Sequence, residues 1–172
     1  SRAIELIRSR LSPIAAVEPF GSFVTNTTTN AGDVDIAVLF HTDPPGWVRD
    51  AKGKIPLDVV KATMNRISRL LPRSCVKLRI LHSKTPIMKI QLFSKISVDL
   101  VLHDAHGVLM SRVLSDLFAR SPPDLVRLVC MVKHWAKSRG LIDASRGNLS
   151  SYAFTLLVVH YLQSLGVVGE VV

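Results

Sequence analysis

Short apolar runs, rich in β-branched residues and bounded by turn residues, occupy the middle of this 172-residue sequence. Such runs are typical of buried β-strands and are too short for packed helices. The first of them ends in His-Thr-Asp-Pro-Pro-Gly, which is a strong turn signal. The expected strands cover residues 34–40, 76–81, 87–93 and 96–102.

Helical spacing of apolar residues frames these strands and takes over after Asp104. The expected helices cover residues 2–11, 57–71, 108–120, 122–139 and 150–165. The segment Ser121-Pro-Pro-Asp124 is a strong helix start, because serine caps a helix, proline suits its first position and an acid suits its first turn. The last helix is apolar nearly all round, so we expect it to be buried.

These patterns predict an α/β fold, more narrowly α+β, with two domains. A mixed-sheet domain is expected at residues 13–107, packed on a helical domain made of residues 1–12 and 108–172. The hydrophobic content of 48% fits a globular protein and not a disordered one.

The chain is strongly basic, with 22 Lys and Arg residues against 13 Asp and Glu, and a formal net charge of +9. This favours a polyanionic partner, and charge alone does not choose between RNA, DNA and an acidic membrane surface. No apolar run reaches the roughly 18 residues that span a bilayer. Cys75 and Cys130 form neither a disulfide framework nor a zinc-site spacing, which favours a reducing intracellular compartment.

Acidic residues accompany two of the expected strands. Asp33 and Asp35 open the first strand, and because residues two apart in a strand share a face, their carboxylates project together about 7 Å apart along the chain. Asp99 lies inside another strand, where an isolated charge is costly. If the strands pair, three carboxylates converge, and such oxygen ligands suit Mg²⁺ or Mn²⁺. The alternatives are that Asp33 and Asp35 are turn and edge residues, and that a basic residue such as Lys89 neutralises Asp99.

Two other groups of residues are candidates for binding phosphate. Gly21-Ser22 precedes Asp33 by eleven residues; a glycine lets the backbone approach a phosphate, and a serine supplies donors. An ordinary turn is the alternative. Lys133 and Lys137 lie four residues apart, one turn along the same face of an expected helix. For them the alternative is a solvated helix face.

Several short motifs occur in an order that resembles a known protein family. Gly21-Ser22, then Gly32 to Ile36 (GDVDI), then Ser97 to Asp99 (SVD), resemble the DNA polymerase β-like nucleotidyltransferase superfamily. A more specific likeness, to the central domain of terminal uridylyltransferases and noncanonical poly(A) polymerases, is carried by Leu128 to Gly140 (LVCMVKHWAKSRG), Asp143 to Phe154 (DASRGNLSSYAF) and His160 to Gln163 (HYLQ).

This resemblance implies a mixed-sheet nucleotidyltransferase palm packed on a helical central domain. It implies that the metal ligands and catalytic residues are Asp33, Asp35 and Asp99. It implies that the nucleotide-binding residues are Gly21, Ser22, Ser111, Lys133, Lys137, Ser151 and Tyr152. The ring of Tyr152 would stack on the base, which every base permits. Without the resemblance, Tyr152 would be interpreted as a core residue.

The implied activity is template-independent addition of a nucleotide to an RNA 3′ hydroxyl, with release of pyrophosphate. The segment 143–152 resembles uridylyltransferases most, so UTP is the expected substrate, and poly(A) addition from ATP is the alternative. The expected partners are an RNA 3′ end and a larger RNA-processing complex, not a membrane, with a mitochondrial location ahead of a cytoplasmic one. A hypothesis of another class is a catalytically degenerate RNA-binding or scaffold subunit.

The chain departs from the family pattern at three positions. Gly32 stands where the family often has serine, and Asn26 where it often has glycine, a mild change because asparagine tolerates a left-handed turn. Met110, next to Ser111, falls where the family has a ribose-contacting asparagine, and methionine cannot make that hydrogen bond. Because the family usually continues beyond the point that matches Val172, part of the helical domain is expected to be missing.

Overall fold

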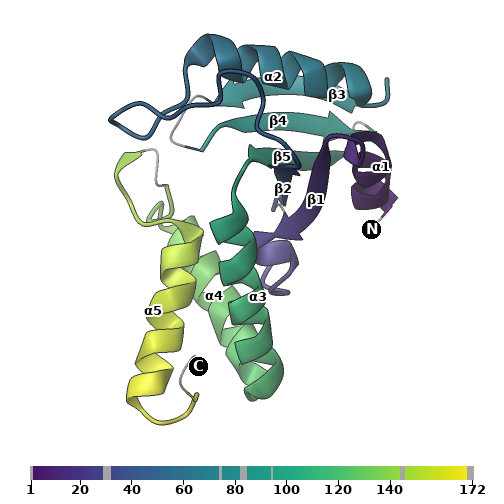
Figure 1. The fold of residues 1–172 in the computed structure, drawn as a ribbon. Coiled ribbons are helices and arrows are strands. Elements are labelled where there is room, and N and C mark those ends of the chain that lie inside the picture. Colours follow the sequence, from purple (N-terminus) through teal and green to yellow (C-terminus); the bar gives the residue numbers. More distant parts are fainter. Residues whose placement is uncertain are drawn as a thin grey trace. The chain divides into compact units, whose positions relative to one another are not determined.

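The computed structural model describes residues 2–28, 32–73, 75–81, 85–93, 95–143 and 146–169. Figure 1 shows the path of the chain, which forms two compact units. One unit contains residues 1–20 and 33–109, and the other contains residues 21–32 and 110–172. We refer to them as the sheet unit and the helical unit.

The sheet unit is built on five strands in the order β1-β2-β5-β4-β3. Their bounds are β1 Ala15–Phe20, β2 Val34–Phe40, β3 Cys75–Leu81, β4 Ile87–Leu92 and β5 Ile96–Leu102. Strands β2 and β5 run parallel and every other pair is antiparallel, so the sheet is mixed, as the sequence predicts. The edge strand β1 was not predicted; it contains Pro19, which an edge strand tolerates because one side of its backbone needs no partner.

Two helices complete the core of the sheet unit: α1, Arg2–Leu11, and α2, Leu57–Leu70, which lies over one face of the sheet (Figure 1). Side chains from both helices and from β1, β2, β4 and β5 form one hydrophobic cluster. The expectation that residues 1–12 belong with the helical domain is therefore corrected. The amphipathic face of α1 presents Ile4, Ile7 and Leu11, all 5% exposed or less, to the sheet core.

The helical unit contains α4, Asp124–Ser138, α5, Ser151–Ser164, and most of α3, Ala105–Arg120. Its core is formed by Leu114, Leu117, Phe118, Leu125, Val129, Val158, Val159 and Val168. The expected cap at Ser121 was wrong: its hydroxyl donates to the carbonyl of Leu117 at 2.7 Å, and α4 starts at Asp124.

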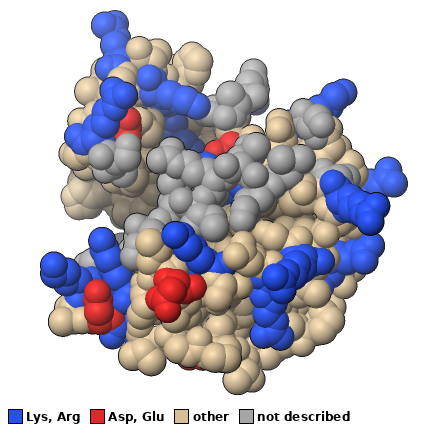
Figure 2. Space-filling view, turned by 90° about the horizontal axis from the view of Figure 1, so that it is seen from above, with Lys and Arg blue, Asp and Glu red and all other residues tan. Residues whose placement is uncertain are grey.

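The expectation that α5 is buried on all sides was also wrong. Its side chains Leu157 and Tyr161 are 52% and 61% exposed, because the described helical unit covers only one side of this apolar helix. In the described residues, no helix is both long and apolar enough to cross a membrane. The face seen in Figure 2 carries more Lys and Arg than Asp and Glu side chains, consistent with the net charge of +9.

Candidate active site

The expected acids meet in the sheet unit because two distant strands pair in parallel. The register of β2 and β5 places Asp35 opposite Asp99, and Asp33 lies directly before β2. On β5 the neighbours of Asp99, Val98 and Leu100, are fully buried in the hydrophobic cluster. Since side chains alternate along a strand, the acids lie on the sheet face opposite to that cluster. The two acid-bearing strands therefore pair, which is the condition under which the three carboxylates converge.

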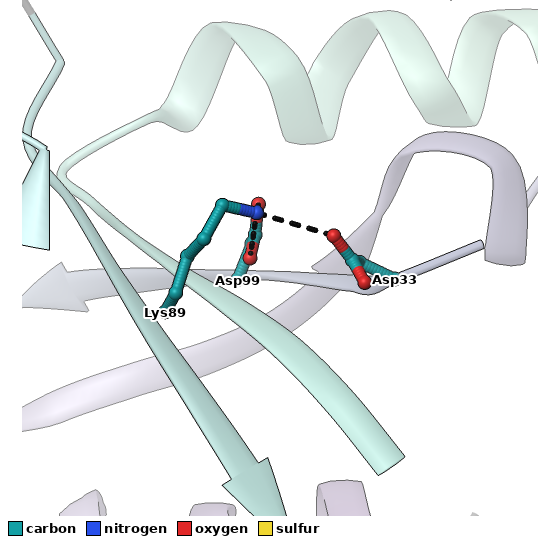
Figure 3. A network of polar contacts seen from close by, with 3 residues as sticks. All are labelled: Asp33, Lys89 and Asp99. Atoms are coloured by element: carbon teal, nitrogen blue, oxygen red, sulfur yellow. Dashed lines mark hydrogen bonds and ion pairs between the residues drawn. The ribbon is translucent and has the colours of Figure 1, made fainter. Parts of the chain in front are cut away.

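Lys89 extends this row of charged residues onto the next strand. The register of β4 and β5 pairs Lys89 with Asp99. The Lys89 Nζ lies 2.6 Å from Oδ2 and 2.8 Å from Oδ1 of Asp99, and 3.1 Å from Oδ2 of Asp33 (Figure 3). Lys89 is therefore the ion-pair partner of Asp99, the contact that the sequence analysis named for this residue.

Burial and ion pairing act in opposite directions on these groups. Burial raises the pKa of the Asp99 carboxyl above its ordinary value, although the Lys89 ammonium acts to lower it. Burial acts to lower the pKa of Lys89, but its hydrogen bonds to Asp99 and Asp33 leave that pKa raised. Burial decides the direction for Asp99 and pairing decides it for Lys89, because the Asp99 side chain is 14% exposed and that of Lys89 is 34% exposed.

The donor set fits a hard divalent cation in part. Among the described residues, no three Asp, Glu, His or Cys side chains are arranged together as a metal site. Two carboxylates, Asp33 and Asp99, do converge on one cationic atom, the Lys89 Nζ, and Asp35 stands in register beside Asp99. Mg²⁺ commonly takes one or two carboxylates together with substrate phosphates, so these oxygen donors suit it.

The helical unit contains the residues that the sequence suggests for phosphate binding. Gly21 begins a short 3₁₀ turn, Gly21–Phe23, with a φ of +69°, and its amide donates to the Ser111 hydroxyl at 2.7 Å. Asn26 adopts a φ of +54°, the left-handed conformation expected of it. Ser111 therefore holds the backbone of the segment that carries Ser22.

Lys133 and Lys137 differ more than their spacing suggests. Lys133 is 6% exposed, and its Nζ donates to the carbonyl of Thr27 at 2.7 Å and to the Thr27 hydroxyl at 3.2 Å. Lys137 is exposed. The alternative of a solvated helix face is wrong for Lys133, which anchors the segment containing residues 21–28.

At the start of α5, Ser150 is the helix cap, and its hydroxyl accepts from the amide of Ala153 at 3.1 Å. Ser151 is the half-buried first residue of this helix, and Tyr152 is 42% exposed. Tyr152 is therefore not a core residue, and its ring is accessible for stacking. Ala144 and Ser145, part of the segment that favours UTP, lie outside the described residues.

Comparison with known proteins gives the family. Residues 1–117, more than half of the chain, match the family described as poly(A) RNA polymerase, mitochondrial-like, central palm domain. The chain belongs to this family.

Some relatives of this palm-domain chain are named poly(A) RNA polymerases, and another, from Trypanosoma brucei brucei, is named terminal uridylyltransferase 4. It is 33% identical over 157 residues to Protein HESO1 of Arabidopsis thaliana, covering 87% of this chain and 29% of HESO1. It is 28% identical over 164 residues to the poly(A) RNA polymerase GLD2 of Danio rerio, covering 95% of this chain and 32% of that protein. The chain thus spans less than a third of either relative.

Among solved structures, the palm-domain chain matches terminal uridylyl transferase 4 from Trypanosoma brucei with bound GTP. The TM-score is 0.78 at 26% identity, and the match covers 99% of this chain and 54% of that one. The fold assignment from sequence, a nucleotidyltransferase palm with a helical domain, is thereby confirmed.

Two features of the palm-domain chain escaped the sequence analysis. The Thr25–Thr27 pair, whose hydroxyls lie 2.9 Å apart, was visible only as part of a polar run. The role of Lys89 as a bridge between two acids was missed, although Lys89 was named as a counter-ion for Asp99. The available signal was a lone lysine in an apolar strand, Ile87–Leu92, next to a strand with a lone aspartate.

Proposed function

We propose that this protein adds nucleotides to the 3′ end of RNA without a template, with UTP as the preferred substrate. One observation carries the proposal. In a member of a poly(A) RNA polymerase palm family, Asp33 and Asp99 converge on one cation, and Asp35 stands in register beside Asp99.

The reaction is a single displacement at phosphorus. The oxygen of the RNA 3′ hydroxyl forms a bond to the α-phosphorus, the bond from that phosphorus to the bridging oxygen breaks, and pyrophosphate leaves while the hydroxyl proton passes to solvent. Divalent ions, when bound, would activate the hydroxyl and stabilise the leaving pyrophosphate. Asp33, Asp35 and Asp99 are the residues that we assign to hold them.

The helical unit would bind the triphosphate. Ser111 and Lys133 fix the backbone at Gly21 and Thr27, so the Ser22 hydroxyl and the nearby amides would be held ready as donors. Lys137 would supply an exposed positive charge to the same triphosphate, and Ser151, at a helix N-terminus, a hydroxyl. Such preorganised donors stabilise charge without needing to reorganise during the reaction.

UTP is favoured by the sequence of residues 143–152, and ATP is the alternative because GLD2 is named a poly(A) RNA polymerase. The basic surface supports an RNA partner, and a larger RNA-processing complex belongs to the same proposal. We also propose a mitochondrial location, supported by the family description alone. Subcellular fractionation with an antibody against this chain tests it; recovery outside mitochondria contradicts it.

A scaffold or RNA-binding subunit is a second candidate, and a specific observation favours it. Lys89 neutralises two of the three acids, as it would in a protein that has no use for a metal. This candidate predicts RNA binding without nucleotide transfer.

One assay separates the two candidates. The protein is incubated with a labelled oligoribonucleotide, Mg²⁺ or Mn²⁺, and each nucleoside triphosphate in turn, with Asp99→Ala as the inactive control. Extension that requires the metal and is lost in the control supports the transferase. RNA binding by the folded protein, without extension by any nucleotide, contradicts the transferase and supports the scaffold.

A further inference from the structure

The Lys89 ammonium is held by carboxylate oxygens of both acids. An ammonium has three N–H donors, and Nζ has three carboxylate oxygens within 3.1 Å: both oxygens of Asp99 and one of Asp33. These acids come from β5 and from the residue just before β2, and Lys89 comes from β4 (Figure 3). A single positive charge therefore links three segments of the chain.

The sheet fixes the place of Lys89. Its neighbours Met88 and Ile90 are at most 1% exposed and belong to the core cluster, so a slip of one residue along β4 would bury the ammonium. The Lys89 side chain itself is 34% exposed. It can therefore leave the carboxylates for solvent by rotating its flexible stem, while β4 stays paired.

We propose that Lys89 is an internal cation that holds Asp33 and Asp99 together in the metal-free protein, and that a divalent ion binds there only by displacing it. This inference rests on the proposed function, because it concerns the metal ligands of that reaction. The ammonium and a divalent ion repel each other and require the same oxygens, so they exclude each other from this position.

This competition has a consequence for the order of binding. A free divalent ion must overcome the Lys89 ion pairs, so the protein without nucleotide binds it weakly. A nucleoside triphosphate brings negative charge that offsets the added cation, so the metal exchanges with Lys89 most readily when it arrives with its substrate. Lys89 is thus a positioning residue that links metal binding to nucleotide binding.

The test compares Lys89→Met with Lys95→Met, a matched change of an exposed lysine at the end of the same hairpin. Mg²⁺ binding without nucleotide is measured by calorimetry, and thermal melting is followed in EDTA. We expect Lys89→Met to bind Mg²⁺ roughly tenfold more tightly than the wild type, because the ion no longer has to displace one charge-assisted contact. We also expect Lys89→Met to melt at a lower temperature than the wild type in EDTA. Lys95→Met should match the wild type, and Lys89→Arg should restore weak Mg²⁺ binding.

Equal Mg²⁺ affinity in the wild type and Lys89→Met would overturn this inference alone, while extension activity would still support the proposed function. If neither the wild type nor Lys89→Met bound Mg²⁺ in the presence of nucleotide, this inference and the proposed function would both be overturned. Should Lys89→Met fail to fold, the wild type is labelled with ¹³C at the lysine ε-carbons and its Lys89 signal is assigned from Lys89→Arg. Addition of Mg²⁺ with UTP must shift that signal and leave that of Lys95 unchanged; an unmoved Lys89 signal refutes displacement.

Discussion

Replacement of Lys133 by methionine should destabilise the helical unit and weaken nucleotide binding at the same time. The ammonium is 6% exposed and donates to the Thr27 carbonyl at 2.7 Å and to the Thr27 hydroxyl at 3.2 Å. A hydrogen bond from a charged group contributes about 1.5–3 kcal/mol, and the change also leaves a buried carbonyl short of a donor. After allowance for the cost of burying the ammonium, we expect a loss of about 2–3 kcal/mol in the free energy of unfolding.

Thermal melting and steady-state kinetics measure the two effects, with Lys137→Met as the matched control on the same helix. At about 2–4 °C per kcal/mol for a chain of this length, Lys133→Met should melt about 4–12 °C below the wild type. Lys137 is exposed, so its replacement should change the free energy of unfolding by less than about 0.5 kcal/mol. Both variants should raise the KM for UTP and ATP by similar factors, because triphosphate contacts carry no information about the base.

Three results would refute this reasoning in whole or in part. If Lys133→Met and Lys137→Met both have the melting temperature of the wild type, the Lys133 ammonium does not hold Thr27 in solution. If both variants lose RNA binding while the KM for nucleotide stays unchanged, the lysines serve the polynucleotide and not the triphosphate. A lower melting temperature for Lys133→Met alone, with KM unchanged, would leave Lys133 as an anchor and remove it from nucleotide binding.

The remaining predictions concern the acids, a thiol and the base. Each of the variants Asp33→Ala, Asp35→Ala and Asp99→Ala should lower nucleotide addition at least about a hundredfold while circular dichroism shows an intact fold, because a metal ligand contributes several kcal/mol. Ordinary activity in any of these variants at unchanged Mg²⁺ contradicts the assignment. Burial raises the pKa of the Cys75 thiol above its ordinary value of 9.0. The thiol's contribution to the free energy of unfolding is therefore fully present below pH 9.0 and is lost as the pH rises through the higher pKa of the folded protein. A pH midpoint of Cys75 alkylation at or below 9.0 in the native protein would disprove this. In competition between UTP and ATP, residues 1–172 alone should discriminate by less than about tenfold or show little turnover, because the exposed Tyr152 can stack on any base; strong preference at robust turnover would show that the base selector lies in this chain.

The spacing of apolar residues predicted most helices and strands, because that spacing follows which side chains are buried in the structure. The strand at 34–40 and the helix at 2–11 have the expected bounds. Strand β1 was missed because Glu18 and Pro19 interrupt its apolar pattern, and only pairing with β2 identifies it. The assignment of α1 to a unit depends on which apolar surface it packs against, and no local signal in the sequence carries that information.

The candidate site was predictable in its residue types but not in its contacts. A lone Asp99 in an apolar strand signals a partner, yet whether that partner is a metal or Lys89 depends on the β2-β5-β4 strand order. The burial of Lys133 was hidden for a similar reason. Its spacing from Lys137 places both on one helical face, and only the approach of the Thr27 carbonyl, which is distant in sequence, separates them.

The segment 21–32 joins the two halves of the proposed mechanism through the chain itself. It leaves the sheet after Phe20 and returns just before Asp33, and the register of β1 and β2 pairs Phe20 with Asp35. Its anchors in the helical unit reach backbone atoms, the Gly21 amide and the Thr27 carbonyl. Backbone anchoring at Gly21 and Thr27 does not depend on the base of a bound nucleotide, so in the proposed mechanism the donors of residues 21–28 would suit the triphosphate that UTP and ATP share. On this proposal, residues 21–28 would align a nucleotide without selecting its base, and selectivity would require groups that reach the base edge.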